Sequence, residues 1–181
     1  VKVAPEMYTY TFNVDGNTVI DNNNMWVNRD IASLTSAFIV PGGRADLYTI
    51  QDVPHGTVSK VWYESPTAGF DRRLSVYTPA GYEQNKKQKY PVLYLLHGAT
   101  DTYMAWPEKG DMMRIADETI AAGTARKMIV VMPDASGIGE RNAGEKMGYF
   151  NVKNWHYEDF FFGEFLPYID QTYRTIASKE G

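Results

Sequence analysis

Alternation of apolar and polar side chains dominates the first 50 residues of the chain. From Tyr8 to Val14, aromatic or aliphatic side chains alternate with threonine and asparagine, which is the period-2 pattern of a half-buried strand. Asp15 and Gly16 follow as a turn that accepts positive φ. A further strand is predicted at "SAFIV", residues 36–40, and is closed by a proline and two glycines. The N-terminal part is therefore predicted to be all β.

A different pattern begins near Asp46. "TVSKVWYES" and "RRLSVYTP" alternate like an antiparallel pair of strands, whereas residues 92–96 and "KMIVVMPD" are continuously apolar. Strands that helices cover on both faces have such apolar runs, as in a parallel sheet. We therefore expect these two strands to be buried on both faces.

Apolar residues at helical spacing predict two helices. In the first, Asp111 is placed to cap the N-terminus and Gly123 to end the helix. The second begins near Tyr157 and contains Pro167, which should bend it or mark its early turns. A glycine-rich polar loop, residues 134–153, precedes it. The order β, β, β, α, β, loop, α predicts an α/β fold with a sheet of parallel type.

Composition removes several classes of function. The 181 residues carry a net charge of −4, which argues against a nucleic-acid partner, because such proteins usually present a basic surface. The chain has no cysteine, so disulfides, thiolate metal sites and a cysteine nucleophile are excluded. No apolar run approaches the ~20 residues of a membrane span, and no signal peptide is visible.

Three segments resemble the esterase-D-like α/β-hydrolases: "YPVLYLLHGATDTYMAW", "MIVVMPDASG" and "YEDFFFGEFLPYIDQTYRTIASKEG". The resemblance is greatest to the family 1 carbohydrate esterases, which are feruloyl and acetyl-xylan esterases. It implies an α/β fold class in which residues 46–181 form the N-terminal half of an α/β-hydrolase sheet. Residues 1–45 resemble the C-terminal part of the early-set immunoglobulin-like β-sandwich domain that precedes such esterases in some secreted bacterial proteins.

The resemblance places the catalytic chemistry beyond the carboxyl ends of the strands. In α/β-hydrolases the loop after the third strand gives a backbone N–H to the oxyanion hole, and here that loop begins at His97. Gly98 lets the backbone approach a substrate, so the amide of Ala99 is predicted to bind the oxyanion. The predicted substrate-binding residues around it are Gly98, Thr100, Asp101, Trp106, Asp134, Tyr149 and Trp155.

The nucleophile elbow G-x-S-x-G of this family is absent from the sequence, since no serine has glycines at positions −2 and +2. The resemblance places the elbow, and then the acid and the histidine of the triad, after "YRTIASKEG". We therefore expect the chain to be a fragment that stops before its nucleophile, downstream of Gly181. Such a fragment would be inactive alone, with the remaining C-terminal half of the same protein as its partner.

Each candidate side chain has a structural alternative. His97 precedes any elbow, whereas the triad histidine follows it, so His97 is interpreted as a hydrogen-bonding residue of the loop. Ser136 lies at a strand end without an evident base, and His156 lacks further ligands at metal-binding spacing. Neither a metal nor a cofactor is expected. Four aromatic residues are typical of a pocket wall and equally of a core: Trp106, Tyr149, Phe150 and Trp155.

The resulting hypothesis is a fragment of a serine carboxylic-ester hydrolase that acts on feruloyl or acetyl esters of plant polysaccharide. The full enzyme would transfer the acyl group through an acyl-enzyme. By resemblance it would be secreted or periplasmic, with an esterified carbohydrate as substrate, no nucleic-acid partner and no membrane span. The alternatives are a non-catalytic carbohydrate-binding or scaffolding module, and an acyltransferase or peptidase of the same fold.

Overall fold

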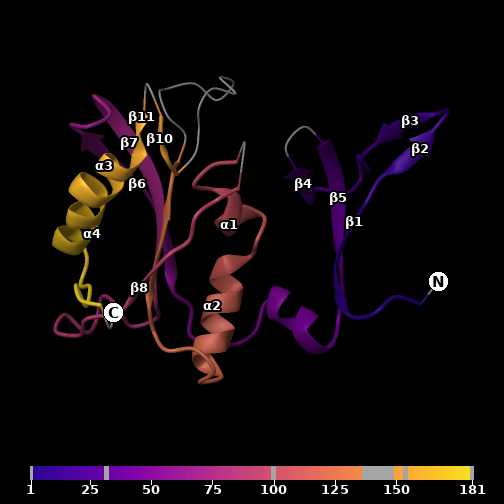
Figure 1. Cartoon of the computed structure of the whole chain (residues 1–181). Helices are drawn as coiled ribbons and strands as arrows, with labels where there is room; N and C mark the ends of the chain where they lie inside the picture. Colours follow the sequence, from indigo (N-terminus) through magenta and orange to yellow (C-terminus); the bar gives the residue numbers. More distant parts are fainter. Residues whose placement is uncertain (1, 31–32, 99–100, 136–148, 153–154, 180–181) are drawn as a thin grey trace. The chain divides into compact units, whose positions relative to one another are not determined.

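The computed structural model describes residues 2–30, 33–98, 101–135, 149–152 and 155–179 (Figure 1). Contacts divide the chain into two compact units, Val1–Asp52 and Val53–Gly181. The domain boundary predicted from the sequence, after residue 45, lies inside the 3-10 helix η1 (Gly43–Tyr48). The assignment of residues 1–45 to an immunoglobulin-like domain stays a prediction.

Apart from the 3-10 helix η1, the described elements of the first unit are strands, as predicted. Its strands are β1 (Glu6–Tyr10), β2 (Phe12–Val14), β3 (Asn17–Val19), β4 (Val27–Asp30) and β5 (Ser33–Val40). The strand expected to run unbroken through residues 8–14 is interrupted at Thr11, because β1 pairs with β5 whereas β2 pairs with β3. The β2–β3 turn is formed by Asp15 at φ 51° and Gly16 at φ 84°, which confirms the predicted positive-φ turn.

The second unit is built on a four-stranded mixed sheet in the order β6-β7-β9-β8. Its strands are β6 (Thr57–Ser65), β7 (Phe70–Thr78), β8 (Val92–Tyr94) and β9 (Ile129–Pro133). The predicted antiparallel pair is confirmed as β6 and β7, and the two apolar segments pair in parallel as β8 and β9. The parallel arrangement expected from the sequence therefore holds for β8 and β9, while β7 runs antiparallel to β9.

Helices lie on both faces of this sheet (Figure 1). One face carries α1 (Ala105–Glu108) and α2 (Met112–Ala121). The other carries α3 (Tyr157–Phe160), the π-helix η2 (Phe161–Phe165) and α4 (Leu166–Thr172). The sequence pattern did not predict α1 or the short hairpin of β10 (Asn151–Val152) and β11 (Trp155–His156). Within the described residues, no helix has the length and apolar character that crossing a membrane requires.

The predicted helix ends are partly right. Gly123, at φ 73°, follows the end of α2 as expected. The capping role of Asp111 is wrong, because its backbone is left-handed at φ 46° and its side chain makes no capping bond. Its carboxylate instead lies 3.2 Å from the guanidinium of Arg114. Pro167 lies in the first turn of α4, where the wider π turn before it accommodates the missing N–H and the ring.

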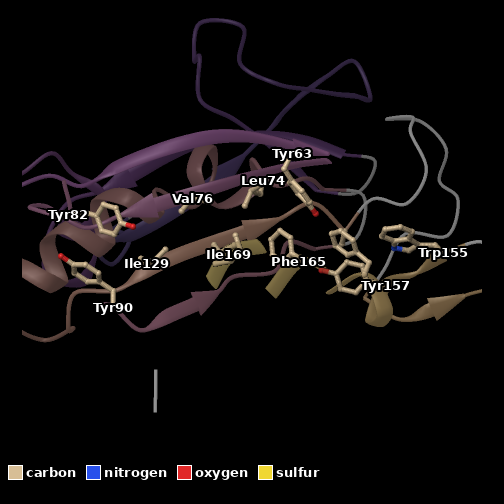
Figure 2. Close-up of a cluster of buried hydrophobic side chains, with 13 residues drawn as sticks. Tyr63, Leu74, Val76, Tyr82, Tyr90, Ile129, Trp155, Tyr157, Phe165 and Ile169 are labelled. Carbon is tan, nitrogen blue, oxygen red and sulfur yellow. The ribbon is translucent and has the colours of Figure 1, made fainter. Parts of the chain in front are cut away.

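The main core lies between the sheet and the helices α3 and α4. Figure 2 shows its side chains spread along the sheet, with Tyr82 and Tyr90 at one end and Trp155 and Tyr157 at the other. The opposite face holds a smaller cluster with Tyr77, Met112, Val130 and Met132. All five residues of β9 are buried, and its first four, residues 129–132, alternate between the two clusters, as expected for a strand covered on both faces.

The expected burial of β8 on both faces is wrong. Leu93 is 45% exposed and Leu96 is 38% exposed, because β8 is the edge strand of the described sheet. On the outer side, the described residues show one β-bridge: Tyr90, just before the strand begins, pairs in parallel with Thr175. An apolar pocket of about 270 Å³ lies on the α2 side, and Leu93 and Leu95 line part of it.

Candidate active site

The two parallel strands place two loops at the same end of the sheet. β8 leads to His97 and Gly98, and β9 leads to Asp134 and Ala135. Because β7 runs antiparallel to β9, the N-terminal half of β7, which contains Arg72, lies at this same end. The carboxyl end of the parallel strands is where α/β sheets bind ligands.

His97 has a structural role at this end of the sheet. Its two ring hydrogen bonds confirm the interpretation as a hydrogen-bonding residue of the loop. Its side chain is buried, with 6% of the residue exposed. The backbone N–H of Ala135 donates to Nε2 over 2.9 Å, so Nε2 is the acceptor nitrogen and the proton of the neutral ring is on Nδ1. Nδ1 then donates to the Gly98 carbonyl over 2.8 Å. Both ring nitrogens are thus engaged by backbone, and neither can deprotonate a hydroxyl while these bonds persist.

Gly98 is exposed, and its carbonyl accepts a second bond from the N–H of Asp101 over 3.2 Å. A Cβ added to Gly98 would meet no atom within 4 Å. The loop therefore leaves open space at the position where a substrate is expected. The predicted oxyanion donor Ala99 and the predicted contact Thr100 lie outside the described residues, so their roles stay predictions.

Two further predicted contacts are engaged within the loops themselves. The carboxylate of Asp101 binds Nζ of Lys109 over 2.9 Å, and both side chains are partly exposed. Trp106 donates from Nε1 to the carbonyl of Leu96 over 2.9 Å. Its indole lines the apolar pocket beside β8. Trp106 therefore anchors the end of β8 to the helix α1.

Asp134 is buried and lies between three cationic or polar groups. Its backbone carbonyl accepts a hydrogen bond from Nη2 of Arg72. Its carboxylate lies 3.9 Å from Nη2 of Arg73 and 3.8 Å from Nε2 of His97. The predicted substrate contact Asp134 is thus located in a polar cluster beneath the two loops.

Sequence reasoning missed Arg72, although two consecutive arginines in a strand that enters the core were a visible signal. Arg72 is 3% exposed. Its guanidinium carbon lies 4.7 Å from the ring centroid of Trp155 and 4.8 Å from that of Phe160. Burial lowers the pKa of Arg72, and the charge of Asp134 opposes this shift. Trp155, a predicted substrate contact, is 4% exposed and packs in the main core.

Tyr149, another predicted contact, closes the cluster from the side of α3. Its hydroxyl donates to the His97 carbonyl, and its ring meets those of His97 and Tyr157 edge-on, at 5.8 and 5.3 Å between centroids. Burial raises the pKa of Tyr149 well above its usual value, so this phenol remains a neutral donor. Ser136 and most of the glycine-rich loop lie outside the described residues. Among the residues that are described, no group of three His, Asp or Glu side chains could hold a metal ion.

Comparison with known proteins identifies the family. An esterase family model, described as "Putative esterase", matches residues 65–180. An endo-1,4-beta-xylanase/feruloyl esterase of Xylanibacter ruminicola is 32% identical over 148 residues, which are 80% of this chain and 20% of that protein. A solved ferulic acid esterase is 40% identical with a TM-score of 0.64, over 70% of this chain and 48% of that one.

A CE1 ferulic acid esterase from Anaeromyces mucronatus, solved with ferulic acid, is 27% identical with a TM-score of 0.58, over 72% of this chain and 48% of that one. The chain therefore spans about half the length of these solved esterases and one fifth of the xylanase/feruloyl esterase. The family match covers more than half of the chain, and the predicted esterase resemblance and α/β-hydrolase fold are confirmed. The chain thus belongs to this esterase family, and its second unit has the fold of part of an α/β-hydrolase.

Proposed function

We propose that this chain is part of a serine carboxylic-ester hydrolase that cleaves feruloyl or acetyl esters of plant polysaccharide. The observation that carries the proposal is the His97–Gly98 loop at the carboxyl end of β8, whose backbone is held by the ring of His97 and by Asp101. Similarity to a xylanase/feruloyl esterase and to a ferulic acid esterase supports the substrate class.

The N–H of Ala99 is the oxyanion donor in this proposal. A serine Oγ attacks the ester carbonyl, and the negative charge that develops on the carbonyl oxygen is bound by this amide. The tetrahedral intermediate expels the sugar hydroxyl and leaves an acyl-enzyme, which water hydrolyses. Loss of one such donor typically costs on the order of 100- to 1000-fold in kcat, so the geometry of this loop should dominate the rate.

The serine, the acid and the triad histidine are supplied by residues outside the 181 in this proposal, because the sequence contains no G-x-S-x-G. We further propose that this second half of the enzyme pairs along β8. The exposed Leu93 and the open outer side of β8 support this arrangement. The parallel bridge of Tyr90 with Thr175 already begins that side of the sheet.

The immunoglobulin-like assignment of the first unit and a location outside the cytoplasm belong to the same proposal. A three-stranded antiparallel sheet with a separate hairpin supports a β-sandwich origin of the first unit. Polysaccharide esters are polymers that a cell meets outside its cytoplasm. The proposed substrate therefore favours a secreted or periplasmic enzyme.

A fusion tests the proposal directly. The 181-residue chain is joined to the second half of the ferulic acid esterase that is 40% identical to it, and hydrolysis of methyl ferulate and p-nitrophenyl acetate is measured. We expect saturable turnover from the fusion and none above background from the chain alone. The control replaces the nucleophilic serine of the added half with alanine. A folded fusion that a serine-directed phosphonate labels, but that hydrolyses neither ester, would contradict the proposal.

A further inference from the structure

The buried Arg72 is not explained by the ester chemistry proposed above. Its cation is buried against the rings of Trp155 and Phe160, which also contact each other. Burying a charge is costly unless its donors are satisfied, and an apolar side chain of similar volume would fill this space at no such cost. An arginine at this position therefore points to a role in directing the groups that it binds.

Arg72 and His97 hold the two ends of one peptide unit. The carbonyl of Asp134 accepts a hydrogen bond from Nη2 of Arg72. The N–H of Ala135, at the other end of the same unit, donates to Nε2 of His97 over 2.9 Å. Because a peptide unit is planar, the direction of its carbonyl fixes the direction of its N–H. Arg72 thereby aims this N–H at the imidazole.

His97 passes this orientation to a second peptide unit. While Nε2 accepts from Ala135, the proton of the neutral ring is on Nδ1, and Nδ1 donates to the Gly98 carbonyl over 2.8 Å. The other end of that peptide unit is the amide of Ala99, which lies outside the described residues. The bond from Nδ1 therefore holds the Gly98 carbonyl, directly before the residue that the proposed function makes the oxyanion donor.

We propose that Arg72 is a positioning residue that sets the tautomer of His97 and, through it, the hydrogen bond that holds the Gly98 carbonyl. The catalytic consequence rests on the proposed function, whereas the tautomer is a property of the chain itself. Arg73, the neighbour of Arg72, is placed differently: it lies near the Asp134 carboxylate and its guanidinium faces the rings of Trp62 and Tyr103.

The tautomer is measured on the ¹⁵N-labelled 181-residue chain at pH 7.5 by long-range ¹H–¹⁵N correlation. We expect one imidazole, identified by its loss in His97→Asn, with its proton on Nδ1. We also expect a nitrogen–nitrogen coupling across the hydrogen bond from Ala135 to Nε2. In Arg72→Met this coupling should vanish and both tautomers should appear. Arg72→Lys keeps the charge without the planar fork and should give an intermediate result.

Arg174→Met is the matched control. The Arg174 guanidinium also lies on an aromatic ring, 3.6 Å from the centroid of Tyr82, and also donates to a backbone carbonyl. Its loss should leave the His97 spectrum unchanged. A folded Arg72→Met or Arg72→Lys chain that keeps the Nδ1–H form and the coupling overturns the proposal. If neither variant folds, the wild type decides: an Nε2–H form of His97, or no coupling between Arg72 Nη2 and the Asp134 carbonyl carbon, overturns it.

The catalytic part is tested in the fusion with the second half of the ferulic acid esterase. We expect Arg72→Lys to lower kcat for methyl ferulate by about 10- to 100-fold, with KM unchanged within about twofold. A changed tautomer with an unchanged kcat would overturn the positioning role. An inactive wild-type fusion whose His97 keeps the Nδ1–H form would count against the proposed function, while the tautomer part would stand.

Discussion

The backbone N–H of Ala135 donates a hydrogen bond to Nε2 of His97 over 2.9 Å, and this bond joins the loop after β9 to the loop after β8. It assigns the histidine of the His-Gly pair an architectural role, because a ring nitrogen that accepts from a buried amide cannot at the same time act as a base. The loop expected to bind the oxyanion is therefore held by a side chain that is itself held by backbone.

His97→Ala should destabilise the chain by about 1–3 kcal/mol, because it leaves the buried N–H of Ala135 without its acceptor. The free energy of unfolding is measured by urea titration. His156→Ala is the control, since His156 is exposed and should change stability by less than about 0.5 kcal/mol. Equal stability of the two variants would show that Ala135 finds another acceptor.

Alanine substitutions at two glycines should differ in their effect on stability. A Cβ on Gly56 would lie 2.4 Å from Cε2 of Tyr77 and 2.5 Å from the backbone oxygen of Thr78, so Gly56→Ala should cost about 1–3 kcal/mol of stability. A Cβ on Gly98 would meet nothing within 4 Å, so Gly98→Ala should leave the free energy of unfolding unchanged within about 0.5 kcal/mol.

In the fusion enzyme, Gly98→Ala should nevertheless lower kcat for methyl ferulate, because its methyl group would occupy space next to the expected oxyanion donor. Chemical denaturation of both variants, together with the kinetics of Gly98→Ala, checks this pair. Full activity of Gly98→Ala would remove Gly98 from the site.

The chain should lose stability above about pH 10. Burial raises the pKa of several tyrosines, including Tyr63 and Tyr77, and raises that of Tyr173 to about 12. Above an unfolded pKa of about 10 the unfolded chain releases these protons while the folded chain retains them, so the free energy of unfolding falls as pH rises. One such group contributes a slope of at most about 1.4 kcal/mol per pH unit.

Tyr63→Phe removes one titrating proton and should therefore make this slope shallower by up to about 1.4 kcal/mol per pH unit. The Tyr63 hydroxyl is buried without a hydrogen-bond partner among the described residues, so its removal should be neutral or slightly stabilising at pH 8. Urea unfolding between pH 8 and pH 11 gives both quantities. A wild-type stability that stays flat up to pH 11 would contradict the raised pKa values.

The exposed edge at β8 should cause self-association. An unpaired strand edge with apolar side chains is a template for pairing with another chain, and Leu93 is 45% exposed on β8. Sedimentation velocity should therefore show dimers or larger species whose fraction rises with concentration, and Leu93→Lys should reduce that fraction. Phe162→Lys, at an exposed residue of η2, is the control and should not. A wild-type chain that stays monomeric at high concentration would contradict this expectation.

Sequence patterns predicted strands, turns and helix ends well where these depend on interactions between residues close in sequence. The Asp15–Gly16 turn, the β6–β7 pair and the end of α2 at Gly123 follow from residue conformational preference and side-chain period. The cap at Asp111 failed because its carboxylate pairs with Arg114. The break at Thr11 was missed because a change of strand partner leaves the alternation of side chains intact.

The site was predicted less completely, because its organisation depends on contacts between distant residues. The sequence placed the His97–Gly98 loop and Asp134 at one predicted site, beyond the carboxyl ends of the strands. Nothing in the sequence pattern indicated that one peptide unit, Asp134–Ala135, is bound by Arg72 on one side and His97 on the other. The packing of the Trp155 indole on Arg72 was not indicated either, and its predicted contact with the substrate stays a prediction.

The sequence by itself determined the α/β-hydrolase class, the esterase resemblance, the open Gly98 loop and the absence of a G-x-S-x-G motif, because these depend on residue type and spacing along the chain. The tertiary structure alone decided which nitrogen of His97 carries the proton and which groups surround the cation buried at position 72. Those properties arise from hydrogen bonds and packing between residues far apart in the sequence, such as Arg72 with Asp134 and with Phe160, and the direction of such contacts is not encoded in any local pattern.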